Sequence, residues 1–185
     1  MTTFLVNSQT ISPKEFPKQC DLTLKSQHLF TYNATMAMIT NHHWPYIPMG
    51  LAELRRLTKG PVIIMTFDPA ALDKFWNAKY FPELIEGEKA KFPQIELITN
   101  GLRGNCKVTE IPIPLNCADG FQEAFLQKEL RLSQSAWVFF PKKVKNKLVK
   151  KLHDDLKSRE WDKKYGHFRT QPFFSSALRL IVSIE

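Results

Sequence analysis

The chain of 185 residues is predicted to form an α/β domain around a mostly parallel sheet. Apolar runs alternate along it with helical patterns, which is the order expected of strands separated by helices. One run, "PVIIMTF" at residues 61–67, is nearly all apolar, as in strands covered on both faces of a parallel sheet. The 43% hydrophobic content is enough for a core of ordinary domain size.

The first strand is expected at residues 34–40. An amphipathic helix should follow within residues 46–60, with Pro48 in its first turn and Gly60 as its stop. Its apolar residues recur at three-residue steps: Leu51, Leu54 and Leu57. Gly60 leads directly into the strand at 61–67, so the three elements predict one strand-helix-strand unit with a right-handed crossover.

The rest of the chain predicts further helices and two more strands. Residues 69–102 are helical in pattern, with breaks at "YFPEL" and "KFPQI", because proline disfavours a helical residue before it. A strand is expected at 107–113, ending in an edge or a bend at its prolines. Residues 120–137 predict a helix with a break, and the alternating "ALRLIVSIE" at 177–185 predicts a closing strand.

The positive charge of the chain is concentrated in one segment. The net charge is +8, and residues 142–164 hold ten Lys or Arg against four Asp or Glu. An apolar stripe at four-residue spacing runs through this segment: Val144, Leu148, Leu152 and Leu156. The spacing favours a helix whose lysines form the solvated face. A nucleic-acid interface is less favoured, because no aromatic residues alternate with the lysines to stack on bases.

Composition also limits location and metal chemistry. No apolar run approaches the about 20 residues of a membrane helix, and "MTTFLVNSQT" lacks the pattern of a signal peptide, so a cytoplasmic location is expected. Cys20, Cys106 and Cys117 are odd in number and lack C-x-x-C spacing, which favours buried or half-buried free thiols. His42 and His43 are adjacent, so on a regular strand they would point oppositely, and no metal site is predicted.

Polar and aromatic residues follow two of the predicted strands where each one ends. His42, His43 and Trp44 come after the first strand, and Thr66, Phe67 and Asp68 come at the end of the strand at 61–67. Ligands of open α/β sheets bind beyond the carboxyl ends of the strands, so these residues should share one cleft if the strands are neighbours. His43, or less favourably His42, could act as a base, since imidazole titrates near neutral pH.

Each of these residues also has a structural interpretation. One histidine could pack while the other caps a helix or faces water, Trp44 could be a lid over the core, and Asp68 could cap the next helix. A second polar group precedes the last strand in "YGHFRTQPFF", and its members are Tyr165, His167, Arg169 and Gln171. Arg169 could pair with a carboxylate of a substrate or with an acidic residue of the preceding helix.

Four stretches together resemble a known family: "MAMITNHHWP", "GLAELRRLTKGPVIIMTFDP", "YFPELIEGEKAKFP" and "YGHFRTQPFFSSALRLIVS". In order and spacing they are similar to class I S-adenosylmethionine-dependent methyltransferases, and most to the small type-11 methyltransferase-domain proteins. The resemblance runs from about residue 29 to the end. It implies a partial Rossmann-like sheet, mostly parallel with an antiparallel last strand, and helices on both faces.

The resemblance also implies a cofactor, a substrate class and contact residues. The cofactor would be S-adenosylmethionine, and a small molecule would accept the methyl group. Asn41 and Trp44 would lie on the cofactor side. The acceptor side would hold Asp68, Tyr165, His167 and Arg169.

The chain departs from the family in its N-terminal part. The family binds the methionine part of the cofactor with a glycine-rich turn after its first strand, but the first glycine here is Gly50. This predicts an N-terminally truncated form, with a divergent segment at 1–28, a methyltransferase-like domain at 29–185 and impaired cofactor binding. The missing strands could be compressed into one, such as "TFLVN" at 3–7.

Three functions follow as hypotheses. The chain could be a methyltransferase acting on a small molecule, with activity reduced or lost by the shortening. It could be a non-catalytic remnant that pairs with itself or with another subunit, because a sheet lacking strands on one side exposes an edge that must be covered. The third and least favoured hypothesis is nucleic-acid binding through residues 142–164.

Overall fold

The computed structural model describes residues 5–6, 9–10, 32–74, 76–114, 121–133, 137, 141–171, 173–175 and 177–184. The chain divides into two compact units. The first unit comprises Met1–Thr66, Pro93–Thr109 and Arg179–Glu185, and the second comprises Phe67–Phe92 and Glu110–Leu178.

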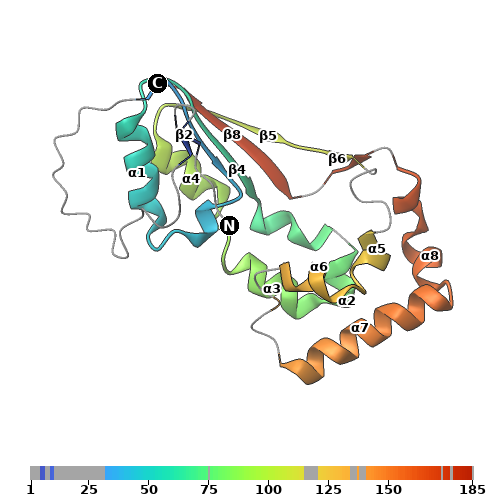
Figure 1. Cartoon of the computed structure of the whole chain (residues 1–185). Helices are drawn as coiled ribbons and strands as arrows, with labels where there is room; N and C mark the ends of the chain where they lie inside the picture. Colours follow the sequence, from blue (N-terminus) through green and yellow to red (C-terminus); the bar gives the residue numbers. More distant parts are fainter. Residues whose placement is uncertain are drawn as a thin grey trace. The chain divides into compact units, whose positions relative to one another are not determined.

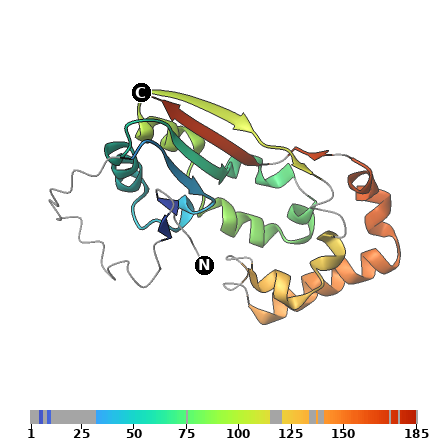
Figure 2. The same cartoon turned by 45° about the horizontal axis from the view of Figure 1, so that its top comes forward.

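A four-stranded sheet is the centre of the first unit (Figure 1). Its strands, in spatial order, are β3 (Thr35–Met38), β4 (Val62–Phe67), β8 (Leu178–Ile184) and β5 (Asn105–Glu110). β3 and β4 are parallel, and Thr35 lies beside Val62. β8 runs against both of its neighbours (Figure 2). The predicted mixed α/β sheet with an antiparallel last strand is therefore confirmed.

Two helices of the first unit pack together on this sheet, α1 (Ile47–Leu57) and α4 (Ile95–Leu102). Their apolar residues form one core with the strands: Ala37, Leu51, Val62, Ile64, Ile98, Leu102 and Ile181. Along β4, buried and half-buried residues alternate, so one face of this strand is covered more completely than the other. At β3 the more open face carries Met36 and Met38, which are 49% and 44% exposed.

Gly60 has a different role from the one expected. α1 has a proline in its first turn, as predicted, but it ends at Leu57, before the glycine. The Arg55 guanidinium donates through Nη2 to the carbonyl oxygens of Thr58 and Gly60, each at 2.6 Å. A Cβ on Gly60 would lie 2.1 Å from the carbonyl oxygen of Asn33. The glycine is thus required by close backbone approach rather than by the end of the helix.

The second unit consists mainly of short helices. They are η3 (Pro69–Lys74), α2 (Asn77–Tyr80), α3 (Pro82–Lys89), α5 (Phe121–Ala124), α6 (Lys128–Ser133), α7 (Lys142–Lys157), α8 (Glu160–Tyr165) and η6 (Gly166–Arg169). The predicted break at "YFPEL" falls between α2 and α3, where Pro82 begins the second helix. The break at "KFPQI" precedes α4, and the break within 120–137 separates α5 from α6.

The strand expected at 107–113 is divided in two. β5 ends at Glu110, and a short β6 (Ile113–Pro114) pairs antiparallel with β7 (Phe173–Phe174). The interruption contains Pro112, which has no backbone N–H to donate. β5 also stands at the end of the spatial order, so the expected edge and the expected bend are both present.

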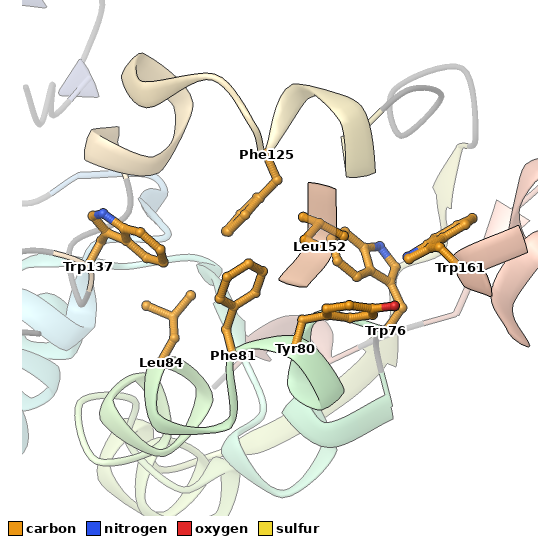
Figure 3. Close-up of a cluster of buried hydrophobic side chains, with 8 residues drawn as sticks. All are labelled: Trp76, Tyr80, Phe81, Leu84, Phe125, Trp137, Leu152 and Trp161. Atoms are coloured by element: carbon orange, nitrogen blue, oxygen red, sulfur yellow. The ribbon is translucent and has the colours of Figure 1, made fainter. Parts of the chain in front are cut away.

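Aromatic rings fill the core of the second unit (Figure 3). Its buried members are Trp76, Tyr80, Phe81, Leu84, Phe125, Trp137, Leu152 and Trp161. The Trp76 ring meets Tyr80, Phe125 and Trp161 edge to face, with centroids 5.8, 6.1 and 5.7 Å away. Such geometry adds to the gain from burial alone. Leu152 comes from the apolar stripe of α7, so the predicted packing face of that helix is confirmed.

The N-terminal expectations are only partly covered by the structure. A short strand, β1 (Leu5–Val6), lies within "TFLVN", but it pairs with β2 (Gln9–Thr10) and does not join the four-stranded sheet. The proposed division at residue 28 and the cysteines at 20 and 117 lie outside the described residues. Cys106 is a half-buried free thiol, as predicted. None of the helices that the structure describes has the length and apolarity needed to cross a bilayer.

Candidate functional site at the carboxyl ends of two parallel strands

The chain leaves β3 through a strained turn. β3 and β4 are parallel neighbours, so both carboxyl ends lie at the same edge of the sheet. Ile39, just after β3, has a φ of 48° and donates its N–H to the carbonyl oxygen of Met65 at 2.7 Å. A β-branched residue rarely adopts a left-handed backbone, and such strain concentrates at functional sites. The strained backbone at Ile39 therefore marks this turn as a candidate functional site.

A buried amide follows the strained residue. Asn41 begins the helical turn η2 (Asn41–His43), and its side chain has no exposure to solvent. Its Oδ1 accepts a hydrogen bond of 2.9 Å from the hydroxyl of Thr66, which is also fully buried on β4. Its Nδ2 is buried and has no hydrogen-bond partner among the residues that the structure describes. A buried polar group without a partner costs about 1–3 kcal/mol, and in native structures it calls for an explanation such as a ligand.

The two histidines lie next to each other in η2. Their ring centroids are 3.8 Å apart, with the planes tilted by 45°. They do not point to opposite sides as on a regular strand, because β3 ends at Met38 and the backbone turns before it reaches them. His42 is half-buried and His43 is exposed, so His43 is the more accessible imidazole. No group of three His, Cys, Asp or Glu residues suited to a metal ion occurs in the part of the chain that the structure describes.

Trp44 packs against the core of the first unit. It is half-buried, and a Cβ on Gly50 would lie 2.4 Å from its Cε3 atom. Helix α1 thus comes close to the indole only because residue 50 is a glycine. This is the lid arrangement that the sequence left open, and stacking on a ligand by Trp44 stays a prediction.

Asp68 belongs to the second unit, where it caps a helix. Its Oδ1 accepts the N–H of Ala70 at 3.0 Å, and its backbone carbonyl accepts the N–H of Ala71 at 3.1 Å. Its own N–H donates to the carbonyl oxygen of Ala177 at 2.7 Å. The capping interpretation accounts for these contacts, and a role in orienting a substrate stays a prediction.

Arg169 is bound by two carboxylates of the second unit. Its Nη2 donates to Oε1 of Glu123 at 2.6 Å, and its Nε donates to Oδ1 of Asp162 at 2.7 Å. The guanidinium also lies over the Trp161 ring, 4.9 Å from its centroid. Burial opposes the charge, but the two carboxylates prevail and raise the pKa of Arg169 above its ordinary value. Asp162 is on the preceding helix α8, so the ion pair that the sequence left open is present.

Tyr165 and His167, two further members of this group, contact Phe168 near the α8–η6 junction. Tyr165 is half-buried and stacks on Phe168 at an interplanar angle of 22°. His167 is exposed, with its ring centroid 4.2 Å from that of Phe168. Their proposed contacts with a methyl acceptor stay predictions.

Four of the predicted site residues are thus brought together, and one contact of the site was not predicted. Asn41, His42, His43 and Trp44 are consecutive at the end of β3 in the first unit. Asp68, Tyr165, His167 and Arg169 belong to the second unit. Thr66 was expected at this edge of the sheet from its place at the end of β4, but its hydrogen bond to Asn41 was not predicted.

Comparison with known proteins identifies the fold. No family model matches the sequence, and no curated protein matches it. Among solved structures, the chain is similar to the crystal structure of a "Putative methyltransferase from antibiotic biosynthesis pathway" from Anabaena variabilis. The TM-score is 0.75 at 22% identity, over 84% of this chain and 67% of the other. The chain therefore shares the α/β fold of that protein.

Proposed function

We propose that the chain takes part in methyl transfer from S-adenosylmethionine to a small molecule, through the turn at Asn41–Trp44. The observation that carries the proposal is the buried, unpartnered Nδ2 of Asn41 at the carboxyl edge of a methyltransferase-type sheet. Ligands of open α/β sheets bind at that edge. A hydrogen-bond donor kept there without a partner suits a ligand that brings an acceptor atom.

The described residues fit such a cofactor in part. When bound, the cofactor supplies the electrophilic methyl group, so the protein mainly positions the reactants and removes a proton. Asn41 would hold the cofactor through Nδ2, and Trp44 would border it. His43 would take the proton of the acceptor hydroxyl or amine. No described strand is followed by a glycine-rich turn. The fit therefore concerns only the part of the cofactor that would lie next to Asn41 and Trp44.

Calorimetric titration of the purified, folded chain with S-adenosylmethionine and S-adenosylhomocysteine tests the proposal. We expect one-to-one binding at micromolar affinity, or about 8 kcal/mol. Asn41→Leu should weaken binding by at least tenfold. The matched control Asn100→Leu changes an exposed asparagine of α4 and should leave the affinity unchanged. No heat up to millimolar ligand, from a chain with a cooperative melt, would refute the proposal.

A second candidate function, pairing with another subunit, is favoured by the outer edge of β3. Thr35 and Ile39 donate their N–H groups toward β4, to the carbonyls of Pro61 and Met65, so the backbone groups of Met36 and Met38 face away from the sheet. Within the described residues no strand pairs with this edge. The strand "TMAM" also lacks the lysine or proline that commonly protects an edge. We propose that a second copy or a related subunit covers it.

A further inference from the structure

We propose that Thr66 is a positioning residue that sets the polarity of the ligand site by orienting the carboxamide of Asn41. The inference rests on the proposed function above, and it adds a residue from the neighbouring strand. It also limits the chemistry of the ligand to a group with a free lone pair at the point of contact.

A carboxamide can meet a threonine hydroxyl in two orientations. Here the hydroxyl of Thr66 donates to Oδ1 of Asn41, so the N–H groups of Nδ2 are directed elsewhere. In the reversed orientation Nδ2 would donate to the hydroxyl, and Oδ1 would be the unpaired buried atom. Whether the site presents a donor or an acceptor thus depends on the direction of the Thr66–Asn41 hydrogen bond, and in the observed direction it presents the donor Nδ2.

Two backbone hydrogen bonds fix the main chain of the turn that carries Asn41. The N–H of His43 donates to the Thr40 carbonyl at 3.0 Å, and the N–H of Trp44 donates to the Asn41 carbonyl at 3.1 Å. Asn41 and Thr66 are both fully buried, so the amide cannot exchange its protein partner for bulk water without local opening. In this proposal a local opening of the turn admits a ligand atom that accepts a hydrogen bond from Nδ2.

The Nδ2 donor of Asn41 limits which ligand atoms can bind next to it. An amide N–H needs a lone pair, which a carboxylate, a carbonyl oxygen or an unprotonated ring nitrogen supplies. A carboxylate makes the strongest of these bonds, because charge-assisted hydrogen bonds are roughly twice as strong as neutral ones. A protonated amine at the same point would face a like dipole and be rejected. The site thus selects ligands by an acceptor group next to Asn41.

Titration with S-adenosylhomocysteine of full-length variants tests this role. Thr66→Val keeps the side-chain volume but removes the hydroxyl, and we expect it to weaken binding by about tenfold. Thr66→Ser restores the hydroxyl and should bind nearly as the wild type does. Thr109→Val, the same change at an exposed position of β5, should have no effect. Asn41→Asp keeps the acceptor for Thr66 but removes the donor, so it should weaken binding at least as much as Thr66→Val.

A nuclear magnetic resonance measurement separates positioning from general stability. The side-chain amide signals of Asn41 should shift on addition of S-adenosylhomocysteine in the wild type and in Thr66→Ser. In Thr66→Val they should broaden, because both carboxamide orientations become populated. Wild-type affinity in Thr66→Val or in Asn41→Asp would overturn the inference while the proposed function stands. A wild-type chain that binds no S-adenosylhomocysteine would instead overturn the proposed function, and with it this inference.

Discussion

At some positions of this chain, the residue type is determined by how closely another group approaches the backbone. Gly50 allows the indole of Trp44 to lie against α1, and Gly60 allows the carbonyl of Asn33 to approach the end of that helix. Neither glycine has a positive φ, so conformational freedom is not the reason for either one. Ile39 shows the reverse case, since a β-branched residue occupies a left-handed position that a glycine would adopt without strain.

Gly50→Ala should destabilise the first unit, although alanine is the better helix former. In an open helix position this change would gain about 1 kcal/mol. Here the new methyl group would overlap the Trp44 ring, which is held by the core, and we expect a net loss of about 1–3 kcal/mol. Urea unfolding followed by tryptophan fluorescence measures the effect.

The matched control is Gly166→Ala. A Cβ at Gly166 would meet its nearest neighbour, Cβ of Asp162, at an ordinary 3.8 Å. The control variant should be as stable as the wild type or slightly more stable. If Gly50→Ala unfolds at the same urea concentration as the wild type, the close packing of Trp44 on α1 is not the reason for a glycine at position 50.

Among the elements, α7 shows how one helix can serve two environments. Its buried side contributes Leu152 to the aromatic core, and its exposed side carries lysines such as Lys143 and Lys147. This confirms the prediction that the lysines form the solvated face, and nucleic-acid binding by that face stays a hypothesis. α7 is also joined to α2 by a hydrogen bond of 2.7 Å from the Tyr80 hydroxyl to Oδ2 of Asp155.

The Tyr80 hydroxyl should make the second unit sensitive to alkaline pH. Burial, and then the carboxylate of Asp155, raise the pKa of Tyr80 well above its ordinary value near 10. The folded state therefore retains a proton that the unfolded state loses above about pH 10. The stabilisation is complete below pH 10, and it declines as the pH rises from there toward the folded-state pKa.

Tyr80→Phe should separate the two parts of this effect. At pH 8 it removes a hydrogen bond to a charged group and should cost about 1.5–3 kcal/mol. Above pH 10 its free energy of unfolding should fall less steeply than that of the wild type. Urea unfolding between pH 8 and pH 11 measures both parts, with Tyr46→Phe, an exposed tyrosine, as control. Parallel curves for the wild type and Tyr80→Phe would contradict the assignment.

For the molecule as a whole, the open edge of the sheet bears on its state in solution. Met36 and Met38 lie on the same face as their neighbours on β4, Ile63 and Met65, so apolar side chains border the unpaired backbone groups of β3. Exposed apolar surface next to a free strand edge favours association. The net charge of +8 opposes it in general, but the excess lies mainly in residues 142–164 and not in β3.

The purified chain should therefore be a dimer or a larger assembly, and the double variant Met36→Lys/Met38→Lys should be a monomer. The lysines would place two like charges at the edge, where a partner strand would have to bury them. Size-exclusion chromatography with light scattering measures the mass of both proteins. Leu132→Lys, a similar change at an exposed residue of α6, should leave the assembly intact. A monomeric wild type with a cooperative melt would exclude pairing through β3.

Local pattern was enough to predict most of the elements. The apolar run at 61–67, the leucine spacing of α1 and the stripe on α7 each report whether one side of an element is buried, and burial periodicity is a property of neighbouring residues. The prolines at "YFPEL" and "KFPQI" likewise act on the residue before them, so the helix breaks were predicted near their observed positions. The polar residues after β3 were also predicted as a site from local pattern, because they directly follow an apolar strand in the sequence.

Contacts between distant residues were decided only by tertiary structure. The bond between Asn41 and Thr66 spans 25 positions, and it exists because the register of β3 on β4 brings the two strand ends together. The choice of Glu123 and Asp162 as partners of Arg169, and the need for glycine beside Asn33, are set in the same way by chain packing. The sequence contains these residues but not their separations in space, because many pairings satisfy the same local pattern and only the packed fold selects one.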